Sequence, residues 1–198
     1  QGTLYSLQEL KDIHDVCRKY DMYLFVDGAR LGYGLGSEKN DVALEDLAAL
    51  TDVFYFGGTK CGALFGEAVV ITADALKKRF KAYMKQNGAV LAKGWLLGLQ
   101  FHCLLEHDLY FTATRRADAL AMKLREVFAE QGIPFWVESF TNQQFVILSD
   151  VQKETLEKRY IFEPMGKSAD GGNIARFCTS WATTEEEVQT LIDDLRTL

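Results

Sequence analysis

Apolar residues near the start of the chain recur at the spacing of a helix that is apolar on one face. These positions are Leu7, Leu10, Ile13, Val16 and Cys17. They are preceded by Ser6, with Glu9 three residues further on, which is the pattern of a capping box at the first turn of a helix. The spacing therefore predicts an amphipathic helix over residues 7–20.

Short apolar runs then alternate with a second helical segment. The predicted elements are a strand over 22–26, a helix over 41–50 and a strand over 52–56. The first strand ends at Asp27 and a glycine-rich stretch, 32–36, which favours a buried strand that opens into a loop. Because a helix between two strands places them parallel, both strands should end at one edge of a sheet. Asp27 and Lys60, each just past a strand, should face one crevice there.

The second half of the chain shows a different pattern. Residues 91–131 are rich in helix formers and predict one long or kinked helix that leaves the first domain. The other predicted elements are a strand over 67–72, a helix over 73–83, strands over 135–138, 144–148, 159–163 and 174–180, a helix over 151–158, and a final helix that begins at the capping box of Thr184 and Glu187. We therefore divide the chain into a first domain, 1–105, and a small α+β domain, 106–198.

Composition narrows the class of protein. The chain has 198 residues, is 48% hydrophobic and carries a net charge of −6, which indicates an ordinary globular protein and argues against a nucleic-acid partner. It has no run of eighteen apolar residues, so we expect no membrane span. The four cysteines form no CxxC pair and the three histidines lack the spacing of metal ligands, so we expect no metal site. The scattered cysteines also favour the reducing cytoplasm.

One aspartate at the end of an apolar strand is a weak signal, because nucleotide hydrolases also place a metal-binding aspartate there. This chain, however, has no GxxxxGK[ST] phosphate-binding loop. The stronger signal is a pair of motifs at the ends of successive strands. They are Asp27-Gly28-Ala29-Arg30 and Gly57-Gly58-Thr59-Lys60.

This pair of motifs resembles the threonine aldolase and β-eliminating lyase group of pyridoxal phosphate (PLP) enzymes. In that group D-G-A-R supplies the aspartate of the cofactor, and a small-residue turn ending in lysine supplies its Schiff base. The resemblance extends from Tyr5 to Ser180. It implies an α/β chain that forms the second half of a PLP-dependent transferase-like (fold type I) large domain, with a mainly parallel sheet, followed by a small α+β C-terminal domain.

The resemblance also implies roles for five residues. Asp27 and Lys60 would be catalytic, and both would bind PLP together with Thr59 and Arg30. Arg30 and Arg176 would bind the substrate carboxylate, a task suited to a planar, bidentate guanidinium group. From the residues alone, Arg30 could instead stabilise its loop through an ion pair, and Arg176 could be an ordinary surface arginine.

The activity that the resemblance implies is retro-aldol cleavage of a β-hydroxy-α-amino acid, such as threonine, to glycine and an aldehyde. Open alternatives are β-elimination or transamination on the same fold, because a fold does not fix which bond breaks, and a non-catalytic fragment. The resemblance further implies a homodimer or homotetramer, and an N-terminal segment of the same polypeptide that this chain lacks. Stereochemistry, the preferred aldehyde and the general base are beyond the sequence.

Overall fold

The computed structural model describes residues 2–198, which form two compact units. The N-terminal unit consists of Tyr5–Leu35 and Asn40–Thr112. The C-terminal unit consists of Ala113–Leu198, the described residues up to Leu4, and the short segment Gly36–Lys39. No sequence pattern predicted that Gly36–Lys39 would belong to the C-terminal unit.

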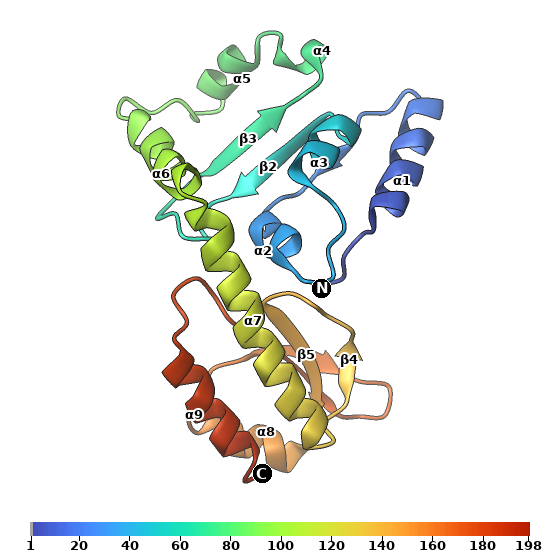
Figure 1. Ribbon diagram of the computed structural model, residues 1–198, viewed down its shortest axis with the longest axis vertical. Coiled ribbons are helices and arrows are strands. Elements are labelled where there is room, and N and C mark those ends of the chain that lie inside the picture. Colours follow the sequence, from blue (N-terminus) through green and yellow to red (C-terminus); the bar gives the residue numbers. More distant parts are fainter. Residues whose placement is uncertain (1) are drawn as a thin grey trace. The chain divides into compact units, whose positions relative to one another are not determined.

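A three-stranded sheet lies at the centre of the N-terminal unit (Figure 1). Its strands are β1 (Phe25–Val26), β2 (Val53–Gly57) and β3 (Glu67–Ile71), in the order β1-β2-β3. The predicted parallel pairing of the first two strands is confirmed, but β3 runs antiparallel to β2, so the sheet is mixed. The reason is the short connection after β2, which contains no crossover helix of the kind that parallel strands need.

The helices of this unit begin with α1 (Leu7–Lys19), which confirms the first predicted helix. Its capping box forms as expected, because the Ser6 side chain accepts a hydrogen bond from the Glu9 amide and the Glu9 carboxylate accepts one from the Ser6 amide. The other helices are α2 (Leu31–Gly36), α3 (Leu44–Leu50), α4 (Asp74–Lys77), α5 (Phe80–Gln86) and α6 (Trp95–Glu106).

Two local predictions near Asp27 were wrong. The glycine-rich stretch forms helix α2 rather than a loop, because tertiary contacts outweigh the low helix propensity of glycine: Tyr33 is only 1% exposed, and its hydroxyl donates to the carbonyl of Lys60. The first strand is neither as long nor as buried as predicted. Strand β1 has two residues and one neighbour, which leaves Phe25 57% exposed.

Two predicted helices are interrupted at residues with positive φ. The helix predicted over 73–83 divides at Arg79 (φ 62°) into α4 and α5. Neither helix has a buried residue, so no packing against a core stabilises one continuous helix. The long helical segment divides at Asp108 (φ 55°) into α6 and α7 (Leu109–Glu130). The two compact units divide within α7, after Thr112.

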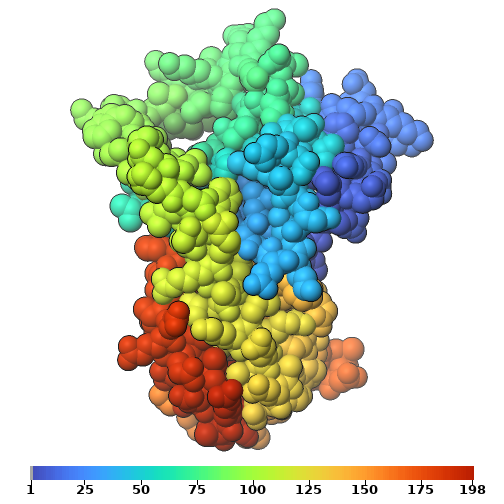
Figure 2. Space-filling model, viewed as in Figure 1, coloured from blue at the N-terminus to red at the C-terminus, as the bar shows by residue number. Residues whose placement is uncertain are grey.

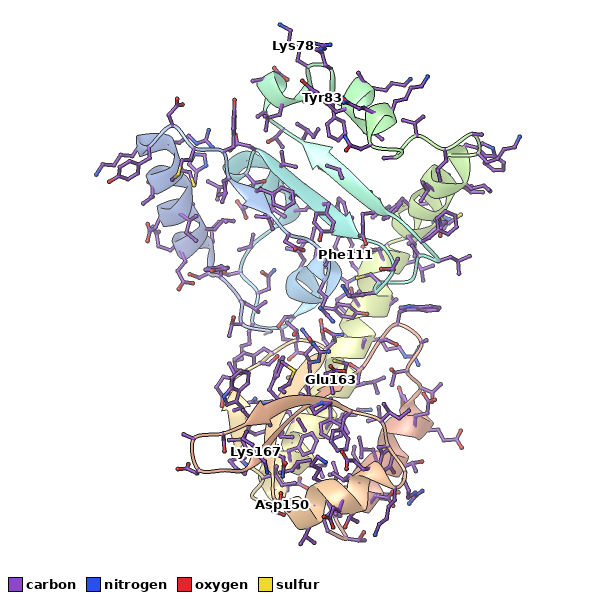
Figure 3. All side chains as sticks on the ribbon, turned by 180° about the vertical axis from the view of Figure 1, so that it is seen from behind. Lys78, Tyr83, Phe111, Asp150, Glu163 and Lys167 are labelled. Carbon is purple, nitrogen blue, oxygen red and sulfur yellow. The ribbon has the colours of Figure 1, made fainter. Side chains whose placement is uncertain are left out.

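The C-terminal unit contains a four-stranded antiparallel sheet in the order β4-β5-β7-β6. Its elements are β4 (Phe135–Val137), β5 (Gln143–Leu148), α8 (Asp150–Glu157), β6 (Glu163–Lys167), β7 (Asn173–Cys178) and α9 (Glu185–Leu195). The strand predicted over 159–163 was wrong. Tyr160 and Phe162 pack against the core, whereas the ladder is formed by the exposed edge strand β6, whose Pro164 is tolerated at an edge. Lys167 of β6 pairs with Asp150 at 3.3 Å (Figure 3).

The core of the C-terminal unit lies between the sheet, α7, α8 and α9. Its central side chains are Leu120, Leu124, Phe128, Val146, Leu148, Leu156, Phe177, Ile192 and Leu195. Helix α9 lies beside the second half of α7, where Lys123 is 4.0 Å from Glu185 (Figures 1 and 2). None of the helices within residues 2–198 combines the length and apolar character needed to cross a membrane.

Candidate active site

The ends of β1 and β2 bring the two sequence motifs to one edge of the sheet. The parallel register pairs Phe25 with Val53 and Val26 with Phe54. Continued by one residue, this register places Asp27 level with Tyr55. Lys60 follows β2 in a tight turn at the same edge, so both predicted catalytic residues lie at one edge of the sheet within the N-terminal unit.

Glycines allow the two loops at this edge to touch. The Gly57 amide donates to the Gly28 carbonyl at 2.8 Å. A Cβ atom on Gly57 would lie 2.3 Å from the Ala29 carbonyl oxygen, and one on Gly28 would lie 1.6 Å from the Tyr55 carbonyl oxygen. Any larger residue at either position would push the loops apart. The glycines therefore let backbone approach backbone, which fixes Asp27 relative to the turn that carries Lys60.

Asp27 is exposed at this edge and is held by two hydrogen bonds. Its carboxylate accepts one from the Tyr55 hydroxyl and one from the Ala29 amide at 3.1 Å. These bonds, Tyr55 first, hold the pKa of Asp27 below its ordinary value, and the nearby charge of Lys60 lowers it further. The same hydrogen bond raises the pKa of Tyr55 to about 12. Asp27 is thus an oriented and ionised carboxylate within the electrostatic reach of Lys60.

The turn that carries Lys60 is fixed through its backbone. The Lys60 carbonyl accepts a hydrogen bond from the Tyr33 hydroxyl, and the Cys61 amide donates to the Gly58 carbonyl at 2.9 Å. The Gly58 amide in turn donates to the Glu67 carboxylate at 2.6 Å. The Lys60 side chain is exposed and has no hydrogen-bond or ion-pair partner within residues 2–198. A fixed backbone therefore presents an accessible amine.

A buried tyrosine ties the two loops together from behind. The Tyr110 hydroxyl donates to the Gly57 carbonyl at 3.0 Å and accepts from the Gly32 amide at 3.2 Å. Cys61 is fully buried beside it, and burial raises the pKa of its thiol. A buried thiol with a raised pKa is a poor nucleophile, which supports a packing role for Cys61.

The other predicted site residues lie in different surroundings. Thr59 is exposed next to Lys60, and Arg30 is partly buried at the start of α2. Arg176 belongs to the C-terminal unit, on β7, where it lies 3.4 Å from the side-chain oxygen of Gln143. Its Nε atom is buried and has no partner among the described residues. In the same part of the chain, no three His, Cys, Asp or Glu side chains gather around a possible metal ion.

The sequence analysis missed the residues that hold the site in place, chiefly Tyr55, Tyr33 and Glu67. Tyr55 had only a partial signal: it lies on the strand predicted to neighbour Asp27, but aligning the predicted strands 22–26 and 52–56 by their ends places Gly57 opposite Asp27, two residues away from the observed register. Tyr33 and Glu67 had none, since their roles depend on a helix that was predicted as a loop and on the antiparallel return of β3.

Residues 1–151 match the family model described as "Beta-eliminating lyase". The chain belongs to this family. Its members are PLP enzymes, and the residues at the sheet edge fit that cofactor: a fixed carboxylate suits the pyridine nitrogen, and an accessible lysine suits the aldehyde.

Several named proteins are similar to this member of the β-eliminating lyase family. A low specificity L-threonine aldolase of Pseudomonas aeruginosa is 32% identical over 98% of this chain and 56% of its own length. The solved structure of Leishmania major threonine aldolase is 42% identical, with a TM-score of 0.96 over 99% of this chain and 57% of that one. A lysine aminotransferase of M. tuberculosis, 16% identical with a TM-score of 0.58, shares the fold alone. The chain spans about half the length of the curated relatives it matches first.

Removing the Tyr55 hydroxyl should weaken the hold on Asp27. In the full-length protein, we expect Tyr55→Phe to raise the dissociation constant of PLP roughly tenfold, the order expected for one hydrogen bond to a charged group. Absorbance titration of the apoenzyme measures this constant directly. Because Tyr55 lowers the pKa of Asp27, the variant should also lose PLP at a higher pH than the wild type as pH falls. Tyr83→Phe, on an exposed α5 tyrosine, is the control (Figure 3); equal constants for both variants would contradict the assignment.

Proposed function

We propose that the whole protein is a PLP-dependent lyase that cleaves a β-hydroxy-α-amino acid, such as threonine, to glycine and an aldehyde. The observation that carries this proposal is the position of Asp27 and Lys60 at one sheet edge, close enough for the charge of Lys60 to lower the pKa of Asp27. Similarity to proteins named threonine aldolases, at 30–42% identity, supports the choice of substrate. The activity is proposed for the full-length polypeptide, because this chain spans only about half the length of the relatives.

Each site residue has a role in this proposal. Lys60 binds PLP covalently, and Thr59 and Arg30 contact the cofactor beside it. Asp27 holds a proton on the pyridine nitrogen, because a carboxylate next to that nitrogen stabilises its protonated form. Bound PLP supplies an electron sink for the electron pair that is released when the substrate's Cα–Cβ bond breaks. The fixed backbone around Gly28 and Gly57 keeps these groups aligned without reorganisation.

Arg176 and Arg30 bind the substrate carboxylate in this proposal. The unpartnered Nε atom of Arg176 supports its part, because a guanidinium group with an unused N–H can still donate a hydrogen bond to a carboxylate. Holding the carboxylate orients the bond that is to break, which is how binding selects the reaction.

Loss of this clamp should mainly affect substrate binding. We expect Arg176→Gln in the full-length enzyme to raise the KM for threonine on the order of 10- to 100-fold, the range expected for a charge-assisted hydrogen bond. The kcat should fall less. Steady-state kinetics separates the two parameters. Arg196→Gln, on a surface arginine 3.4 Å from Glu130, is the matched control. A lower kcat with unchanged KM would contradict a binding role.

The chain would contribute to two domains of the whole enzyme. We assign residues 1–105 to the PLP-binding large domain and 106–198 to the small C-terminal domain. The remaining part of the large domain would come from an N-terminal segment of the same polypeptide. A homodimer or homotetramer is supported by apolar side chains exposed on and near α6, such as Trp95 at 65% and Leu64 at 81%. Four free cysteines support a cytoplasmic location.

One experiment tests cofactor, lysine and reaction together. The full-length protein is purified with PLP, reduced with borohydride and mapped by mass spectrometry, and unreduced enzyme is incubated with threonine. We expect the reduced cofactor on Lys60, and glycine with acetaldehyde as products. A 2-oxo acid would favour elimination or transamination instead. The absence of any adduct would overturn the enzyme proposal, and sedimentation of the same preparation tests for the oligomer.

A further inference from the structure

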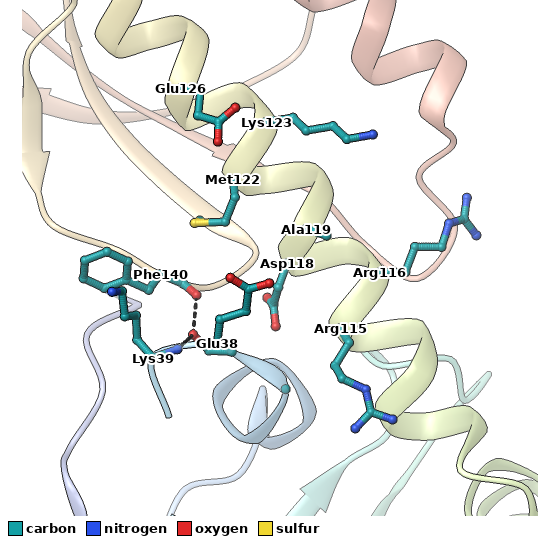
Figure 4. Close-up of a pocket in the computed structure, with 12 residues that line it drawn as sticks. Glu38, Lys39, Arg115, Arg116, Asp118, Ala119, Met122, Lys123, Glu126 and Phe140 are labelled. Carbon is teal, nitrogen blue, oxygen red and sulfur yellow. Dashed lines mark hydrogen bonds between the residues drawn. The ribbon is translucent and has the colours of Figure 1, made fainter. Parts of the chain in front are cut away.

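A pocket in the C-terminal unit contains a charged residue without a partner. The pocket, of about 530 Å³, lies between the middle of α7 and the segment Gly36–Lys39, with Phe140 at one side (Figure 4). Asp118 of α7 forms part of its wall and is only 4% exposed. Neither of its carboxylate oxygens makes a hydrogen bond of normal geometry within residues 2–198, although the Asn142 backbone amide is near enough to lower its pKa, and no cationic side chain bonds to it. Folded proteins rarely leave a buried carboxylate in this condition.

The wall opposite Asp118 is fixed rather than loose. The Ser37 hydroxyl donates to the Phe140 carbonyl at 2.7 Å, and the Lys39 amide donates to the Ser37 hydroxyl at 3.3 Å (Figure 4). Gly36 lies against the carboxylate: a Cβ atom there would be 3.3 Å from the Asp118 Oδ2 atom. A small shift of this segment therefore cannot readily supply the missing partner.

The basic side chains around the pocket have contacts other than Asp118. Arg116 donates to the Thr183 carbonyl at 3.1 Å, Lys123 is 4.0 Å from Glu185, and the Lys39 ammonium lies 5.8 Å from the centre of the Phe140 ring. Arg115 also lines the pocket without bonding Asp118. Two further carboxylates, Glu38 and Glu126, face the same space. The pocket thus has room for one more side chain, and its buried carboxylate has no cation bonded to it.

We propose that this pocket holds a lysine or arginine side chain from the part of the full-length protein that this chain does not contain. The relatives are nearly twice as long as the matched region, so a large share of the whole protein's contacts lies outside these residues. Ala119 and Met122 offer an apolar wall for the aliphatic stem of such a side chain, and Asp118 offers a partner for its charged end. The proposal is independent of the chemistry at Lys60.

Substitution of Asp118 by asparagine gives results of opposite sign for a paired and an unpaired carboxylate. A paired carboxylate stabilises the protein at every pH above its ordinary range, so Asp118→Asn should lower the Tm of the full-length protein by at least about 4 °C throughout pH 6–9. An unpaired carboxylate behaves differently. Burial raises the pKa of Asp118 to about 8 even though the Asn142 backbone amide lowers it, so ionisation weakens the protein as pH rises, and asparagine would then raise the Tm, increasingly toward pH 9. That result would overturn the proposal.

Controls and a second measurement identify the occupant. Asp170→Asn, on an exposed carboxylate of the same unit, should leave Tm unchanged. Each Lys and Arg of the remaining part is then changed to Met with and without Asp118→Asn, and the partner is the residue whose effect disappears in the double variant. If the Tm loss requires a dialysable cation and returns with free lysine or arginine, a small ligand occupies the pocket and the proposal fails. Should Asp118→Asn not fold, a full-length structure decides, by the presence or absence of a Lys or Arg nitrogen within about 4 Å of Asp118.

Discussion

Replacing Lys60 by alanine in the full-length enzyme is expected to lower kcat/KM for threonine on the order of 10³-fold or more, because the residue that binds the cofactor covalently is lost. The variant should also yield no borohydride-stable PLP adduct. Both results follow from the position of Lys60, whose exposed amine is the one presented by the fixed turn after β2. Mass spectrometry of the reduced protein measures the adduct, and glycine release measures the activity.

A second lysine provides the control for this experiment. Lys78, which follows α4, is an exposed lysine of the same unit and lies outside both sequence motifs of the site (Figure 3). We expect Lys78→Ala to keep both the adduct and the activity. If Lys60→Ala retained an adduct at full yield, another lysine would bind the cofactor, and the assignment of the site would be wrong.

Replacing Asp27 by asparagine should lower kcat on the order of 10²-fold or more, because a neutral amide cannot stabilise a proton on the pyridine nitrogen. Asparagine keeps the shape of the side chain and can still accept the Tyr55 hydrogen bond, so the fold should be unaffected. Near-ultraviolet circular dichroism checks the fold, and titration with PLP should show weaker binding. Asp170→Asn is the control on an exposed carboxylate outside the site. An unchanged kcat would contradict the role of Asp27.

The pH dependence of the wild type provides an independent check on Asp27. Its pKa is lowered in the folded protein, first by the Tyr55 hydroxyl, so the ionised form persists to lower pH than an ordinary aspartate would allow. The stabilisation that it contributes is present above the ordinary pKa of aspartate and is lost as pH falls through the lowered value. Cofactor binding should therefore persist in mild acid. Release of PLP at the ordinary pKa of an aspartate would show that Tyr55 does not hold the carboxylate.

Local sequence signals predicted several elements well because those elements depend on neighbouring residues. The helices α1 and α9 begin at capping boxes whose two bonds join residues three apart. The parallel pairing of β1 with β2 followed from the helix between them. Failures occurred where distant contacts decide the backbone. Helix α2 contains three glycines and exists because Tyr33 is buried and bonded to Lys60, and β6 is an exposed edge strand that only its pairing with β7 defines.

The sequence by itself determined the chemistry of the site: an aspartate and a lysine at the ends of successive strands, in motifs that point to one family. Only the tertiary structure decided how these residues are held. The register of two parallel strands gave Asp27 its partner Tyr55, and contact between Gly28 and Gly57 joined the loops. Tertiary packing likewise left Asp118 buried without a partner, although nothing about this helical aspartate is unusual in the sequence. Side-chain identity sets which bonds a residue can make, whereas the fold sets which of them are made.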